Sequence, residues 1–119
     1  MFRIVCAAAA LLLAPSAWAH PKLVAATPAA DAAVATPSRI ALRFSEKLMP
    51  KLSDVTLLMT GMAGMKHAPM PVGSTTAAVG DTLTVIPAKP LTAGSYRVEW
   101  HVVSADTHRI AGSYAFSVR

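Results

Sequence analysis

The chain has 119 residues, a formal net charge of +5 and a hydrophobic content of 54%, whereas charged residues make up 14%. This length is enough for one domain with its own hydrophobic core. The basic residues are scattered rather than gathered in runs, which argues against a nucleic-acid-binding protein. A single cysteine, Cys6, excludes a framework of intramolecular disulfides.

The first 19 residues have the pattern of a secretory signal peptide. A positive charge, Arg3, precedes an apolar run, and the small residues of an Ala-x-Ala cleavage site end at Ala19. An uncleaved membrane anchor is the alternative, but a helix needs about 20 apolar residues to span a bilayer, and this apolar run is shorter. We therefore expect residues 1–19 to be removed together with Cys6. The mature domain, 20–119, then has a net charge of +4, because Arg3 is lost, and no thiolate for a disulfide or a metal.

Cleavage after Ala19 would make His20 the first residue of the mature chain. An N-terminal histidine can offer its α-amine and its ring Nδ1 to the same ion, a chelate that an internal histidine cannot form. Nitrogen-rich tetragonal sites suit Cu(II), which also heads the divalent affinity order. The alternative is that His20 merely follows the cut and has no role. His20 is therefore a candidate Cu(II) ligand.

The mature part predicts an all-β sandwich or barrel, because short alternating apolar runs are separated by proline, glycine, serine and threonine. The expected strands lie at 40–44, 55–59, 82–86, 96–102 and 114–118. The segment 27–37 is expected to be a loop with room for one turn, since prolines bound it. The segment 61–76 is expected to be a long loop, and such loops in compact domains often carry function.

Methionines are concentrated in one short segment in the middle of the chain. It holds four of the six methionines and one histidine, namely Met59, Met62, Met65, His67 and Met70. Thioether sulfur is a soft, neutral ligand that favours Cu(I). A helical stripe that fills a core is the alternative, but Gly61, Gly64 and Pro69 disfavour a helix. The segment therefore predicts a Cu(I)-binding loop, in which Met59 could equally be a core residue at a strand end.

A second candidate lies in a turn-like stretch before the last strand. Asp106 and His108 are two residues apart, a spacing that can present both side chains on one side. His108 could supply an imidazole to a metal, and Asp106 a carboxylate, either as a direct ligand or by orienting a ligand. A solvated turn in which the aspartate caps its own backbone is the alternative.

Two further polar residues have weaker patterns. His101 shares the expected outer face of its strand with Arg97 and Glu99, so we interpret it as a surface histidine. Glu46 follows a strand, and contact with the N-terminal site is one interpretation, but a solvated charge at a strand end is the simpler one. Neither residue is assigned to a metal site on this pattern.

Taken together, these motifs resemble the CopC/PcoC family of periplasmic copper-resistance proteins. The resemblance spans the mature chain and rests on His20-Pro21, Phe44-Ser45-Glu46, Leu48-Met49-Pro50, the methionine segment, Tyr96-Arg97-Val98-Glu99-Trp100, Ser104-Ala105-Asp106-Thr107-His108 and Gly112-Ser113-Tyr114-Ala115-Phe116. It implies an immunoglobulin-like Greek-key β-sandwich or barrel of about seven strands.

The same resemblance implies two copper sites. One is a Cu(II) site from the amine and ring of His20 with Asp106 and His108, with Glu46 nearby. The other is a Cu(I) site at the methionine segment, which is present in some family members. It also implies a periplasmic location and an inner-membrane partner of the CopD kind, and we expect the domain to be a monomer.

Three functions are compatible with these patterns. The leading hypothesis is a non-catalytic copper carrier or buffer, in which ligand softness separates Cu(II) from Cu(I). A copper-dependent oxidase with an N-terminal histidine brace is the alternative, although the chain is short and has few aromatic residues to stack on a polysaccharide. A structural or adhesive β-domain with incidental metal affinity is the third.

Overall fold

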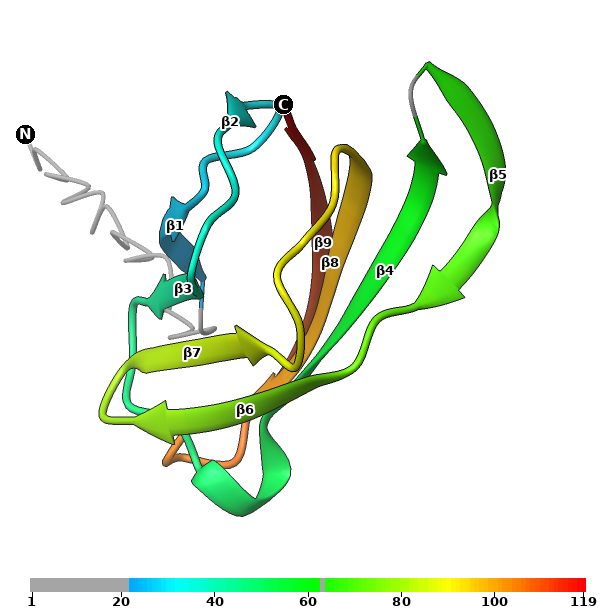
Figure 1. The fold of residues 1–119 in the computed structure, drawn as a ribbon. Helices are drawn as coiled ribbons and strands as arrows, with labels where there is room; N and C mark the ends of the chain where they lie inside the picture. Colours follow the sequence, from blue (N-terminus) through cyan, green and yellow to red (C-terminus); the bar gives the residue numbers. More distant parts are fainter. Residues whose placement is uncertain (1–21, 63) are drawn as a thin grey trace, which may run out of the picture.

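A computed structural model describes residues 22–62 and 64–119, so the predicted signal peptide and His20 lie outside the described residues. The described residues form nine strand segments and one 3-10 turn (Figure 1). Their bounds are β1 Leu23–Thr27, β2 Ala33–Val34, β3 Ile40–Phe44, η1 Pro50–Leu52, β4 Asp54–Met62, β5 Met65–Pro71, β6 Ser74–Val79, β7 Thr82–Pro87, β8 Gly94–Val103 and β9 Arg109–Val118. No helix within these ranges is long and apolar enough to cross a membrane.

The strands form two sheets that face each other. One sheet has the order β1-β3-β7-β6, and the other has the order β2-β9-β8-β4-β5. The pairs are antiparallel except for the short parallel pair of β2 and β9. The predicted all-β sandwich is confirmed, and the segments beyond the expected count include the two-residue β2 and the edge strand β5.

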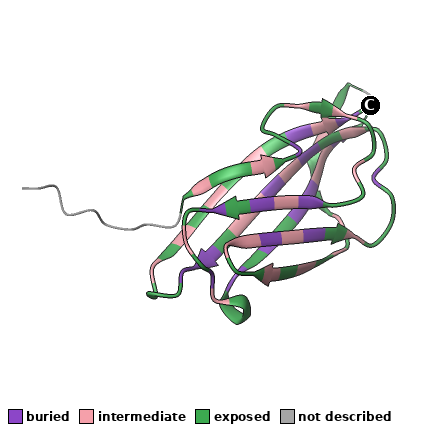
Figure 2. Cartoon of the chain, turned by 90° about the vertical axis from the view of Figure 1, so that its left-hand side faces the viewer, coloured by how far each residue is buried: buried purple, intermediate pink, exposed green. Residues whose placement is uncertain are grey.

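The core lies between the two sheets and follows the period of two that the strands require. On β8, Tyr96, Val98 and Val102 are 2%, 0% and 1% exposed, and Figure 2 shows buried residues alternating with more exposed ones along the strands. Trp100, on the same face, is half-buried and meets Phe44 edge-on, with ring centroids 6.1 Å apart. The sequence-predicted core face of this strand is therefore correct.

The expected long loop at 61–76 was wrong. Most of this segment is strand: β4 continues to Met62, β5 runs from Met65 to Pro71, and β6 begins at Ser74. The prolines that suggested a loop are tolerated because β5 is the last strand of its sheet, and an edge strand does not need every backbone N–H for pairing. The methionines therefore lie on a β-hairpin rather than on an irregular loop.

The expected loop at 27–37 is largely confirmed, with one addition. Within it, β2 pairs with β9, Ala33 opposite Ser117 and Val34 opposite Val118. This pair is too short to show as an apolar alternation in the sequence.

A buried serine fixes the start of β4 against the end of β8. Ser53 is 8% exposed, and its Oγ accepts a hydrogen bond from the backbone N–H of Val103 at 3.1 Å. The same hydroxyl faces the Val103 carbonyl oxygen at 3.4 Å. Because buried polar groups need hydrogen-bond partners, this contact stabilises the end of β8 from within the fold.

Candidate metal sites

The first candidate site is the turn between β8 and β9, which carries Asp106 and His108. The backbone N–H of Ser104 donates to the His108 carbonyl at 2.9 Å, and the N–H of Thr107 donates to the Ser104 carbonyl at 2.8 Å. Thr107 has a φ of 74°, in the left-handed region that a β-branched residue rarely adopts. These bonds close a tight turn that holds the two predicted site residues at one end of the sandwich.

The segment before β4 supports this turn from the side. Leu48 forms an isolated antiparallel bridge with Ser104. The Ala105 N–H donates to the Lys47 carbonyl at 2.9 Å, and the Met49 N–H donates to the Val103 carbonyl at 2.7 Å. The first arm of the turn, at 103–105, is therefore paired with the segment 47–49 on one side and with His108 on the other, which limits the positions that its side chains can take.

The side chains of the turn form a connected chain of hydrogen bonds. The Ser104 hydroxyl donates to Asp106 Oδ1, and Asp106 Oδ2 lies 3.0 Å from His108 Nδ1. The Ser104 hydrogen bond, followed by those from His108, holds the pKa of Asp106 below its usual value against the opposing effect of desolvation. The lowered pKa favours the ionised carboxylate, which can accept a hydrogen bond from the Nδ1–H of His108.

This arrangement suits His108 to metal binding. When Nδ1–H donates to a carboxylate, the ring lone pair lies on Nε2, and this is a common way to orient a metal-binding imidazole. The two side chains are 34% and 48% exposed, so a metal can approach from solvent. Among residues 22–62 and 64–119, no three histidine, cysteine, aspartate or glutamate side chains gather closely enough to hold a metal by themselves.

The second candidate site is the β4–β5 hairpin. Strand pairing places Met62 opposite Met65 and Met59 opposite Met70. Directly opposite residues have Cβ atoms about 4.5–5.5 Å apart, close enough for two thioethers to contact one ion. Met62, Met65 and Met70 are 54%, 75% and 58% exposed. Exposed methionines in register are unusual for a core element and leave their sulfur atoms accessible.

The remaining two members of the methionine segment differ from these three. Met59 is half-buried, packs against the core and lines a cavity together with Tyr96. His67 lines a different cavity with Thr60 and Arg97. Its Nδ1 donates to the Ala68 carbonyl at 2.8 Å, and its buried Nε2 has no hydrogen-bond partner among the described residues. The ambiguity about Met59 is thus real, since its side chain takes part in the core.

The two candidate sites lie at opposite ends of the same sheet (Figure 1). Gly61 of the hairpin pairs with Ser95 near the start of β8, whereas Asp54 pairs with His101 near its end. The turn with Asp106 and His108 follows β8, which is 10 residues long. At about 3.3 Å per residue, β8 separates the two regions by about 30 Å. One ion cannot be held by both.

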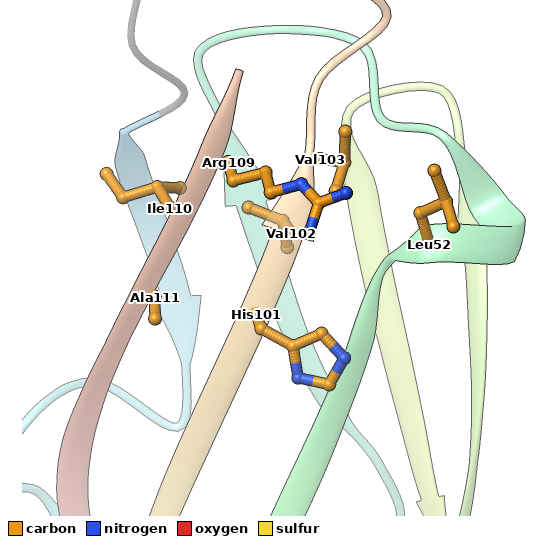
Figure 3. A pocket seen from close by; sticks show the side chains of 7 residues that line it. All are labelled: Leu52, His101, Val102, Val103, Arg109, Ile110 and Ala111. Carbon is orange, nitrogen blue, oxygen red and sulfur yellow. The ribbon is translucent and has the colours of Figure 1, made fainter. Parts of the chain in front are cut away.

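Glu46 and His101 lie near the turn but outside its chain of hydrogen bonds. Glu46 is half-buried and directly precedes Lys47, whose carbonyl supports the turn. His101 is exposed, as expected, and its imidazole faces a shallow hollow of about 350 Å³ beside Leu52 and Arg109 (Figure 3). The hollow is lined by residues of β8, β9 and η1 and not by Asp106 or His108.

The sequence pattern of the CopC domain family matches residues 23–119. The chain belongs to the CopC family. Copper resistance protein C from Pseudomonas syringae pv. tomato is 48% identical over 114 residues, covering 94% of this chain and 90% of the relative. Copper resistance protein C from Escherichia coli is 51% identical over 107 residues, covering 87% and 85%. Protein YobA from Escherichia coli strain K12 is more distant, with 38% identity over 110 residues, covering 91% and 86%.

Solved structures of the CopC family have the same fold. The crystal structure of PcoC, described as a methionine-rich copper resistance protein from Escherichia coli, is 48% identical with a TM-score of 0.78, covering 85% of this chain and 100% of that one. CopC from Methylosinus trichosporium OB3b is 32% identical with a TM-score of 0.69, covering 83% and 93%. The family resemblance read from the motifs is therefore confirmed.

Sequence reasoning did not single out Ser104, although the residue stands within the Ser104–His108 motif. Ser104 is fully buried and donates to Asp106. A serine two positions before an aspartate was a weak signal, because serine is common in turns. Its burial and its bridge to Leu48, which is remote in sequence, are visible only in the structure.

Proposed function

We propose that this CopC-family protein binds copper in the periplasm and carries or buffers it as part of copper resistance, without catalysing a reaction. The observation that carries this proposal is the Asp106–His108 pair, oriented on a turn at the end of the sandwich. The names of its relatives, copper resistance protein C, support the same role. Export depends on the predicted signal peptide at 1–19, with the copper-binding domain at 20–119.

The Cu(II) site consists of His20, Asp106 and His108. The β1 end of the chain supports this set, because the Lys22 N–H donates to Ser45 Oγ at 2.9 Å and the Ser45 N–H donates to the Lys22 carbonyl at 2.8 Å. Ser45 lies two residues before Lys47, which supports the turn. His20 is two residues from Lys22, a reach of about 7 Å. The amine and ring of His20 would complete a nitrogen-rich site with His108, which suits Cu(II).

The Cu(I) site lies on the β4–β5 hairpin, where soft thioethers favour the reduced ion. Its members are Met59, Met62, Met65, His67 and Met70. The cross-strand pairs and the exposure of three methionines support this assignment. Met62 and Met65 are its most accessible members, whereas Met59 must leave part of its core packing to bind the same ion.

The separation of about 30 Å along β8 has a consequence for copper movement. A copper ion cannot pass directly from the Cu(II) ligands to the thioethers of the same molecule. Exchange between the two oxidation states therefore involves release or a second molecule, for which an inner-membrane partner of the CopD kind is our candidate.

The test is to express the full chain with its own signal, confirm the N-terminus by mass spectrometry and titrate Cu(II) while recording electron paramagnetic resonance spectra. The matched control carries one extra residue before His20, which places the α-nitrogen in a peptide bond. We expect a tight, nitrogen-rich signal that weakens in the control. Indifference to the extension would remove His20 from the site and leave the hairpin as the copper-binding region.

A second measurement separates a carrier from an oxidase. We expect the copper-loaded protein to give no polysaccharide oxidation with ascorbate or peroxide above the rate of free copper. Turnover that requires His20 and His108 would instead establish a histidine-brace enzyme.

A further inference from the structure

Ser104 stands out as a fully buried polar residue directly beneath the exposed site. Its exposed fraction is 0%, whereas the side chains of Asp106 and His108 are 48% and 34% exposed. We infer that Ser104 is a positioning residue for Cu(II) binding, which acts through Asp106 to fix the His108 ring. This inference rests on the proposed Cu(II) site and names a residue that would not touch the metal.

The direction of the Ser104 hydrogen bond follows from the acceptors around it. A serine hydroxyl has one proton to donate. Asp106 Oδ1 accepts that proton, and the other acceptor within reach, the His108 carbonyl, is 3.4 Å away and already accepts from the Ser104 N–H at 2.9 Å. Because a hydrogen bond to a charged acceptor is stronger than one between neutral groups, the hydroxyl is committed to the carboxylate.

This commitment fixes the carboxylate and, through it, the imidazole. With Oδ1 held from below by Ser104, Oδ2 is directed at His108 Nδ1, 3.0 Å away. The carboxylate cannot then rotate without breaking its hydrogen bond to Ser104. The imidazole keeps its proton on Nδ1 and its lone pair on Nε2, which leaves Nε2 available to bind a metal ion.

Ser104 can act as a fixed point because its backbone is held on both sides. Leu48 bridges to Ser104 from the segment before β4, and the N–H and carbonyl of Ser104 each make a backbone hydrogen bond within the turn. A serine with a free backbone could move together with the carboxylate, whereas the backbone contacts of Ser104 keep its hydroxyl in place. Mutation of a residue that orients a metal ligand typically lowers metal affinity by about 10–100-fold.

The test is a double-mutant cycle in the processed full-length protein, with Ser104→Ala, Asp106→Ala and the double variant, read out as Cu(II) affinity by competition with a chelator. We expect Ser104→Ala to weaken Cu(II) binding about 10-fold or more. In the Asp106→Ala background the same change should have less than a twofold effect, because Ser104 acts through Asp106. An equal loss in both backgrounds would show a merely structural role and overturn the inference.

Ser53→Ala is the matched control. It also removes a buried hydroxyl at this end of the sandwich, but that hydroxyl contacts only the backbone of Val103 in the hydrogen bonds described above. We expect Ser53→Ala to lower stability and to leave Cu(II) affinity within about twofold. A loss as large as that of Ser104→Ala would mean that any loosening of this end weakens the site, and the special role of Ser104 would be lost.

A measurement without any Ser104 variant covers the case in which Ser104→Ala does not fold. Long-range ¹⁵N NMR of the metal-free protein at about pH 8 reports which ring nitrogen of His108 carries the proton. We expect the proton on Nδ1, and a shift toward Nε2 in Asp106→Ala. A proton on Nε2 in the unsubstituted protein would overturn the inference.

His108→Ala separates this inference from the proposed function. If His108→Ala binds Cu(II) as well as the unsubstituted protein, the proposed site itself is wrong, and the inference fails with it. If His108→Ala loses Cu(II) but Ser104→Ala keeps it, the site stands and only the positioning role fails.

Discussion

The β8–β9 turn and the β4–β5 hairpin both carry candidate copper ligands, yet they hold them in opposite ways. The turn orients an imidazole and a carboxylate with hydrogen bonds that begin at a fully buried serine. The hairpin presents exposed thioethers, and a thioether is too weak an acceptor to be oriented by hydrogen bonds. Strand register does this work instead, because it places methionines opposite each other. The ligand chemistry thus determines how each site can be built.

The largest expected effect is a crossed loss of copper binding. His108→Ala should weaken Cu(II) binding more than about 100-fold, since loss of a ligand exceeds the usual effect of losing its partner. Met62→Leu with Met65→Leu should weaken Cu(I) binding and leave Cu(II) unchanged, because leucine keeps the apolar volume but removes the sulfur. Competition titrations with chelators specific for each oxidation state measure both. If either variant weakens the binding of both ions, the two regions are not independent sites.

The next effect concerns how the hairpin is shaped. A Cβ at Gly61 would lie 2.7 Å from the Met65 carbonyl oxygen, a backbone atom that cannot move freely. We expect Gly61→Ala to cost about 1–3 kcal/mol in urea unfolding and to weaken Cu(I) binding, since the register of the methionine pairs depends on this close approach. Cu(II) binding at the far end of β8 should be unaffected.

Gly73→Ala provides the matched control for this prediction. A Cβ there would lie 3.5 Å from the Ala88 Cβ, an ordinary van der Waals contact. We expect a change in stability within about 1 kcal/mol and no change in Cu(I) affinity. If Gly61→Ala behaved like Gly73→Ala, the hairpin would not need its close backbone approach to bind copper.

The two regions also differ in how well their strands could be predicted from the sequence. The apolar alternation of 96–102 predicted the buried face of β8, because one buried side chain every second residue leaves a clear pattern. The end of β4 beyond Met59 and the whole of β5 were missed, because Gly61, Gly64 and Pro69 are loop signals and an edge strand with exposed methionines has no apolar alternation. Local pattern identifies a strand only where one of its faces is buried.

The site residues divide in a similar way. Asp106 and His108 could be named from a spacing of two, and their contact at 3.0 Å agrees with that pattern. The role of Ser104 could not be predicted, because it depends on the burial of this residue, which forms a bridge with Leu48, 56 positions away in the chain. His20 stays a prediction from the cleavage site. Buried groups that orient a metal ligand are placed by tertiary contacts, so the local sequence pattern does not identify them.

A smaller effect is expected from the backbone of the turn. Thr107 has a φ of 74°, a conformation that costs an ordinary residue about 1–2 kcal/mol and glycine almost nothing. Thr107→Gly should therefore change stability by less than about 1 kcal/mol, because relief of strain offsets the greater freedom of the unfolded chain. Thr56→Gly, at an exposed position within β4, has no such relief and should destabilise by about 1 kcal/mol. Urea unfolding of the two variants gives the comparison, and an equal loss in both would show that the turn is not strained.

The smallest effect is a difference in acid stability between the two regions. The Ser104 hydrogen bond lowers the pKa of Asp106 below the ordinary value of 3.8. A carboxyl whose pKa is lower in the folded state adds stability above its unfolded pKa, and this contribution is lost as the pH falls through the folded value. Metal-free Asp106→Asn should therefore show a shallower loss of stability below about pH 4 than the unsubstituted protein. Met62→Leu, in the hairpin, removes no ionisable group and should keep the original pH dependence. Urea unfolding at a series of acidic pH values decides the matter, and parallel curves for Asp106→Asn and the unsubstituted protein would mean that the hydrogen bonds of the turn do not favour the ionised carboxylate.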